Sequence, residues 1–122
     1  MNGATVLSEK QGFMPAEPCS GQLIADGMAA LLQNLGSVLS RRGKIIGHLK
    51  AMAVSGENFI QMSLTSLPHV GVKADPDWYG QVYHHWDLTI TLIVFGFSEA
   101  QLRPILAEAL QGTVFASLQK VE

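Results

Sequence analysis

Apolar residues recur at helical spacing in the segment that follows Ser20. One stripe collects Ile24, Met28, Leu31, Leu32, Leu35, Val38 and Leu39. This spacing predicts an amphipathic helix of roughly 20 residues. Ser20 is a suitable N-cap for the helix, and Gly43 is a natural stop because glycine tolerates the left-handed conformation that ends many helices.

From Lys44 onward the pattern changes to strict alternation, which predicts a strand. The sequence Ser-Gly-Glu-Asn at residues 55–58 is typical of a type II′ turn, because glycine stands first in the central pair. A return strand over residues 59–67 completes the hairpin. The turn sets a register in which Lys50 lies opposite Ser63.

Two more strands are expected downstream of the hairpin. Residues 69–74 can form a short strand after Pro68, and Asp-Pro-Asp-Trp at residues 75–78 is a strong type I turn sequence. A long alternating run begins at Gln81 and ends near Phe97. It is long for one strand, so we expect it to bend, to bulge or to begin as a loop.

The C-terminal part predicts a second helix. Ser98 and Gln101 match a capping box, and an apolar stripe follows through Leu102, Leu106 and Leu110. Pro104 lies inside this pattern, so the helix either kinks there or begins near it.

These elements predict an α+β fold with the order α-β-β-(β)-β-α. An antiparallel sheet of three to four strands carries the N-terminal and C-terminal helices on one face, as a two-layer sandwich. Residues 19–122 are expected to form this single domain. Residues 1–18 show no regular period and are expected to be an N-terminal arm, either a flexible tail or a strand or arm that packs on a partner.

Composition supports one small domain and narrows the class of partner. The chain has 122 residues, with eight basic and ten acidic side chains and a net charge of -2. This balance argues against nucleic acid as a partner, even though Arg41, Arg42 and Lys44 are clustered. Charged residues make up 15% of the chain, against about 25% in a typical soluble domain. With so few charged residues, some apolar side chains are expected to lie on the surface of the folded chain.

The face of the predicted sheet opposite the helices is mixed. Polar residues such as Ser63 and Thr91 alternate along the strands with the large apolar side chains of Ile46, Met52, Val54, Phe59, Ile93, Phe95 and Phe97. A face exposed only to water carries fewer large apolar groups. We therefore predict that a second subunit covers part of it, most simply in a twofold homodimer.

The sequence contains one cluster that can do acid–base chemistry. In a strand, His85 and Asp87 point the same way about 7 Å apart. If that strand neighbours the first hairpin, His48 and Lys50 share the face, and these four are the candidate catalytic residues. The alternative interpretation is a polar sheet face with ordinary cross-strand pairs.

Aromatic residues near the 75–78 turn are the candidates for ligand binding: Trp78, Tyr83 and Trp86. They can line an apolar pocket or lie in the core. The four histidines include no spacing typical of a metal site, so we expect neither a metal nor a cofactor.

Two features bear on the cellular compartment. Cys19 is the only cysteine, so no disulfide can form within one chain. The apolar run over residues 88–97 is about half a membrane span. We expect a cytoplasmic protein that does not enter a membrane.

The sequence favours a small homo-oligomeric binding or protein-interaction module, with a small molecule as a conceivable ligand. The alternatives are a small hydrolase- or isomerase-like enzyme that uses the His/Asp/Lys cluster, and a structural assembly subunit.

Overall fold

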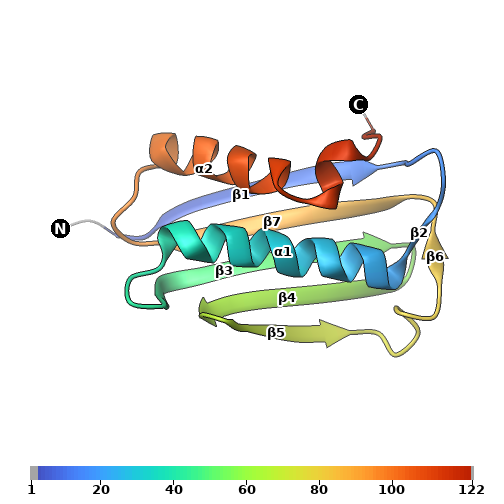
Figure 1. Cartoon of the computed structure of the whole chain (residues 1–122), viewed down its shortest axis with the longest axis horizontal. Helices are drawn as coiled ribbons and strands as arrows, with labels where there is room; N and C mark the ends of the chain where they lie inside the picture. The colour runs from blue at the N-terminus through green and yellow to red at the C-terminus, as the bar shows by residue number, and fades with distance from the viewer. Residues whose placement is uncertain (1–2, 122) are drawn as a thin grey trace.

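The computed structural model describes residues 3–121, which form a sheet with two helices on one face (Figure 1). The main sheet has the spatial order β1 (Thr5–Phe13), β7 (Trp86–Val94), β3 (Lys44–Ser55), β4 (Asn58–Ser66) and β5 (His69–Ala74). The remaining elements are β2 (Cys19–Ser20), β6 (Val82–Tyr83), α1 (Gly21–Leu39), α2 (Glu99–Gln111) and the 3-10 helix η1 (Val114–Ser117). No helix among the described residues is long and apolar enough to cross a lipid bilayer.

The α+β class and the antiparallel sheet are confirmed, but the strand count is not. The main sheet has five strands where three to four were expected, and every neighbouring pair is antiparallel. Strands also precede the first helix, so the order does not begin with a helix as predicted.

The extra strand comes from the segment predicted as an arm. Residues of β1 pair with β7 from Thr5↔Val94 to Phe13↔Trp86, so β1 is an edge of the main sheet. On its helix-facing side only Leu7 and Phe13 are buried. Glu9 and Gln11 stand between them, and this interruption hides the alternation that marks a half-buried strand.

Helix α1 begins where the sequence predicts. The Ser20 hydroxyl accepts a hydrogen bond from Leu23 N at 3.0 Å, which satisfies one of the free N–H groups at the helix start. Gly36 lies inside the helix because the sheet approaches closely there. A Cβ at this position would lie 2.6 Å from a methyl carbon of Leu64.

The β3–β4 hairpin has the predicted register. Lys50 pairs with Ser63 and Val54 with Phe59 around the turn, where Gly56 has a φ of 58°. The pairing is irregular between Lys44 and Leu49, where β3 bulges. A local turn therefore fixes most of this pair, as the sequence implies.

The alternating run after Gln81 is divided in two. Val82 and Tyr83 form β6, which pairs with β2 away from the main sheet, and β7 begins only at Trp86. His84 and His85 lie in the break between them. The expected bend therefore falls directly on the histidine pair.

The C-terminal helix and the turn before β6 are both as predicted. Ser98 and Gln101 form a reciprocal capping box, with Pro104 inside the helix that follows. In the 75–78 turn, Trp78 N donates to Asp75 O at 3.0 Å.

Candidate functional site

The sheet face opposite the helices is the largest feature that the fold leaves uncovered. Both helices lie on the other side of the sheet (Figure 1). Side chains of β1, β7, β3, β4 and β5 alternate between the two faces, so every second residue points away from the core. We call the outward set the open face: Val6, Ser8, Lys10, Ile46, His48, Lys50, Met52, Val54, Phe59, Gln61, Ser63, Thr65, Lys73, Asp87, Thr89, Thr91 and Ile93.

Strand register places a row of hydroxyl groups across the middle of the open face. Thr91 pairs with Ser8 on one side and with Lys50 on the other, and Lys50 in turn pairs with Ser63. The hydroxyl oxygens of Ser8 and Thr91 lie 3.3 Å apart. Lys50 therefore stands among groups that accept hydrogen bonds, at the centre of the sheet.

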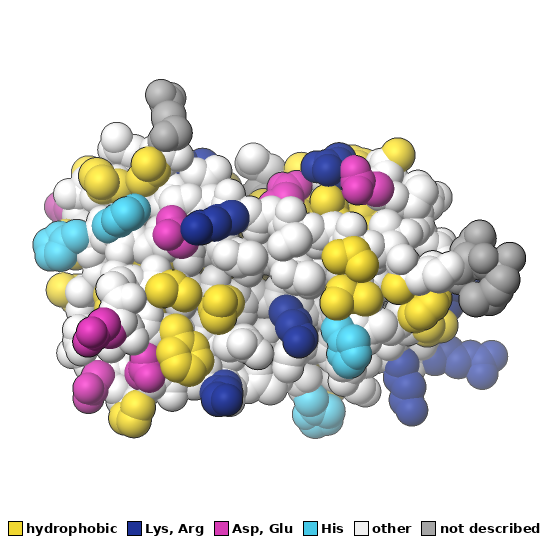
Figure 2. All heavy atoms as spheres, turned by 180° about the vertical axis from the view of Figure 1, so that it is seen from behind, with side chains coloured by type: hydrophobic (Ala, Val, Ile, Leu, Met, Phe, Trp, Pro, Cys, Tyr) yellow, Lys and Arg dark blue, Asp and Glu magenta, His cyan; other side chains and the backbone are white. Residues whose placement is uncertain are grey.

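Apolar side chains gather on either side of this row, as Figure 2 shows. The first patch consists of Met52, Val54 and Phe59, beside the β3–β4 turn. The second consists of Val6, Ile46 and Ile93, at the opposite ends of the same strands. Val6 and Ile46 are more than half exposed, at 57% and 52%. Exposed apolar groups gathered in this way are typical of an interaction surface.

Charge divides the open face along the strand direction. Four acidic residues lie at the end with the β3–β4 turn: Glu57, Asp75, Asp77 and Asp87. Three basic residues lie at the other end: Arg41, Arg42 and Lys44. In Figure 2 several acidic side chains lie towards the left, with Lys or Arg side chains near them, and a group of basic side chains extends to the lower right. The two ends that border the open face thus differ in charge, with Lys10 and Lys73 lying on the open face towards the acidic end.

Two of the acidic groups already have partners within the chain. Asp87 Oδ2 lies 3.8 Å from the Lys10 ammonium, and both side chains are well exposed. Asp75 Oδ2 accepts from Phe59 N at 2.7 Å, which ties the turn after β5 to β4. The other two acidic side chains at this end, Glu57 and Asp77, take part in neither the Lys10 ion pair nor the Phe59 hydrogen bond.

The four candidate catalytic residues do not converge. His48 and Lys50 do share the open face of β3, and β7 does neighbour the hairpin. Asp87, however, pairs with Val54, whereas Lys50 pairs with Thr91, four residues farther along β7. This separation is about 13 Å at the rise of a strand. His85 lies outside β7 altogether, and its carbonyl accepts from the Ser55 hydroxyl. No acid–base pair of these four is in contact.

The three aromatic candidates lie in the core. Trp78, Tyr83 and Trp86 are buried, and the Trp78 and Tyr83 rings stack with centroids 4.3 Å apart. Trp78 Nε1 donates to Gly21 O at 3.0 Å, and the Tyr83 hydroxyl donates to Trp78 O at 3.1 Å. This arrangement joins the 75–78 turn to the start of α1, so these rings serve packing in this structure.

Burial also raises the pKa of Tyr83 above its ordinary value of 10.0, which yields a pH prediction. Desolvation disfavours the phenolate in the folded state, so Tyr83 ionises more readily in the unfolded chain. Its contribution to stability is complete below pH 10 and is lost as the pH rises through the raised pKa.

We expect a Tyr83→Phe variant to be less stable than the natural chain at pH 7 and to approach it above pH 10. Urea denaturation of both proteins from pH 7 to pH 11 measures this difference. A gap in unfolding free energy that stays constant to pH 11 contradicts the expectation.

The part of the chain that the structure describes holds neither a metal site nor a reactive thiol. Among residues 3–121, no three His, Cys, Asp or Glu side chains are grouped so that they can hold a metal ion. Cys19 is buried, and burial raises the pKa of its thiol. A raised pKa lowers the fraction of thiolate, which is the reactive form.

Neither a protein-family model nor a curated protein matches the chain. Among solved structures, the chain is similar to part of a Zn(II)-bound triple mutant of the YjiA GTPase, with 16% sequence identity and a TM-score of 0.43. The match covers 94% of this chain and 30% of that protein, so the chain spans less than a third of its length. Function must therefore be inferred from the side chains of this chain.

The sequence did not assign any part of the open face to β1. Val6, Ser8 and Lys10 belong to it, and Val6 completes the second apolar patch. The sequence signal lay in the helix-facing side of this segment, where Leu7 and Phe13 are apolar but Glu9 and Gln11 between them are polar. This pattern is too weak to distinguish a strand from a tail. Pairing with β7, more than 70 residues away, makes the segment a strand.

Proposed function

We propose that this domain is a homodimeric interaction module in which two copies pack through their open faces. The observation that supports the proposal is the arrangement of that face: apolar patches on both sides of a polar row, with opposite charges at its two ends. Such a surface is complementary to itself. The product is a four-layer molecule, with the two sheets inside and the helices outside.

Charge favours a second copy over an unrelated partner. A twofold axis that lies between the sheets and runs across the strands reverses the strand direction of the second copy. The acidic end with Glu57 and Asp77 then faces the basic end with Arg41 and Lys44, twice over. The same axis sets each strand opposite its own copy, so the two hydroxyl rows face one another and the two Lys50 ammoniums lie near the axis, where the Ser63 and Thr91 oxygens can accept their hydrogen bonds.

The area is sufficient for a stable dimer. Five strands spaced about 4.8 Å apart and averaging about 30 Å in length present a face of about 700 Å². Two such faces bury about 1,400 Å² together, which lies within the range of specific protein–protein interfaces. The sheets stack about 10 Å apart, as in other face-to-face sheet packings.

The mass of the particle in solution tests the proposal directly. We expect sedimentation velocity at tens of micromolar to give twice the 13.2 kDa of one chain. Ile46→Glu should weaken the dimer about a hundredfold, because a carboxylate would then be buried against apolar groups. Val38→Glu is the matched control. Val38 is 56% exposed on α1, away from the open face, and its replacement should leave the dimer intact.

A charge exchange tests the orientation of the two copies. Reversing the basic end with Arg41→Glu and Lys44→Glu places acid against acid and should weaken the dimer roughly tenfold. Adding Glu57→Lys and Asp77→Lys reverses the other end too, so the faces become complementary again and dimerisation should return. A monomer at these concentrations in the natural chain, or a quadruple variant no tighter than the double variant, contradicts the proposal.

A further inference from the structure

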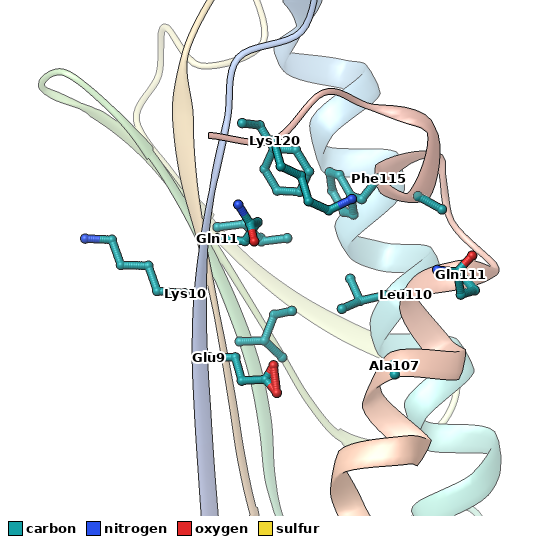
Figure 3. A pocket seen from close by; sticks show the side chains of 12 residues that line it. Glu9, Lys10, Gln11, Ala107, Leu110, Gln111, Phe115 and Lys120 are labelled. Carbon is teal, nitrogen blue, oxygen red and sulfur yellow. The ribbon is translucent and has the colours of Figure 1, made fainter. Parts of the chain in front are cut away.

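A pocket of about 220 Å³ lies on the helix side of the sheet, between β1 and α2 (Figure 3). The C-terminal segment closes one end of it, because Met14 N donates to Gln119 O and Val121 N to Gly12 O, which holds that segment along β1. The pocket lies on the face away from the proposed dimer contact. It therefore stays open whether or not two copies associate.

The floor of the pocket is aromatic and fixed in position. Phe13 stacks on Trp86 with ring centroids 5.4 Å apart, and it packs at a 40° tilt against Phe115 at 5.6 Å. Ile90 and Leu110 complete the apolar lining. All but Leu110 are buried, so the rings cannot rearrange easily. Because Phe13 and Phe115 are each only 1% exposed, a bound apolar group cannot stack on their faces; it packs instead against Ala107, Leu110 and Ala116, which form the accessible wall.

The polar groups at the rim leave one cation available. Glu9 carries an acidic charge but lies 3.7 Å from the Arg103 guanidinium. The Gln11 amide nitrogen donates to Gly12 O and Val121 O. The Lys120 ammonium stands 5.8 Å from the centre of the Phe13 ring, at the mouth of the pocket. Within residues 3–121, no carboxylate lies within ion-pair distance of it.

We propose that this pocket binds a small carboxylate with an apolar body. The apolar body packs against Ala107, Leu110 and Ala116, and the carboxylate accepts hydrogen bonds from the Lys120 ammonium at the water-exposed mouth. An apolar cavity of about 150 Å³ holds benzene, so 220 Å³ admits roughly ten non-hydrogen atoms. Phenylacetate has that size, and it is the probe we choose.

Titration of the uniformly isotope-labelled protein with sodium phenylacetate tests the site, with backbone amide chemical shifts measured by NMR. We expect saturable shifts confined to residues 9–13 and 107–120. Phenylacetate methyl ester, which has no negative charge, should bind about tenfold more weakly. Shifts that do not saturate in the millimolar range overturn the site, and an ester that binds as tightly as the acid overturns the ligand class.

Two pairs of variants separate the pocket from nonspecific binding. Ala107 is an exposed residue of α2 at the pocket wall, so Ala107→Phe should fill the pocket and abolish the shifts. Ala100→Phe, on the same helix but outside the lining, should bind normally. Lys120→Gln should remove the preference for acid over ester. Lys10→Gln should keep it, because the Lys10 side chain points away from the pocket (Figure 3). Binding that survives in a folded Ala107→Phe protein overturns the proposal.

Discussion

A Trp78→Ala variant is expected to lose about 3–5 kcal/mol of the free energy of unfolding, enough to leave a domain of this size marginally folded. Trp78 has no solvent-exposed surface, and its ring stacks on Tyr83. Its indole N–H and its carbonyl are both hydrogen-bonded, the first to Gly21 O and the second to the Tyr83 hydroxyl. Removing the ring leaves a cavity and removes the hydrogen bond to Gly21 O in one step.

Urea denaturation followed by circular dichroism measures this loss. Trp78→Phe keeps an aromatic ring but has no indole N–H, so it should cost less than alanine and report mainly the bond to Gly21. Tyr79→Ala is the matched control, because Tyr79 is the neighbouring aromatic side chain and is 44% exposed. Its replacement should change stability by no more than about 0.5 kcal/mol. A loss below 1 kcal/mol for Trp78→Ala would mean that the ring is not part of the core.

Local patterns predicted the elements whose geometry is set within a few residues. The β3–β4 register follows from a two-residue turn, and both helix starts follow from a serine followed by an apolar stripe. These interactions span three to ten positions of the chain, so spacing alone reveals them. The 75–78 turn belongs to the same class, since Asp75 and Trp78 close it with one hydrogen bond.

Pairing between distant segments determines the elements that local patterns could not predict. Residues 5–13 become a strand only because β7 offers an edge, and Val82 and Tyr83 leave the main sheet because β2 pairs with them. The burial of Trp78 could not be predicted for the same reason, because it depends on a contact with Gly21, 57 positions away along the chain. An aromatic side chain at a turn has the same pattern whether it lines a pocket or closes a core.

The candidate catalytic cluster shows that residues on one face of a sheet can still lie far apart. His48, Lys50 and Asp87 do lie on one face, as alternation within each strand implies. Their separation depends instead on the register between β3 and β7, which no turn connects. That register sets Asp87 opposite Val54, away from Lys50, and the break before Trp86 removes His85 from the strand.

Gly47→Ala should be the most damaging single methyl addition in the main sheet. Gly47 has a φ of 129°, which an L side chain rarely adopts, and a Cβ there would lie 1.8 Å from Ile93 O. The obstructing atom belongs to the backbone of β7, so no rotamer change can relieve the contact. Gly47 lies in the irregular part of β3, where it is still paired with Val94 of β7. Strain and overpacking each cost about 1–3 kcal/mol, and together we expect a loss of at least 3 kcal/mol.

Gly43→Ala separates the two causes. Gly43 also has a positive φ, 81°, but no atom lies within 4 Å of where its Cβ would be. It should therefore lose only the strain energy, about 1–2 kcal/mol. Equal losses for the two variants in urea denaturation would show that β7 yields to the methyl group. Because Gly47 lies between Ile46 and His48, such yielding would also displace the second apolar patch. The folded fraction of Gly47→Ala should then form the proposed dimer more weakly, which Gly43→Ala should not.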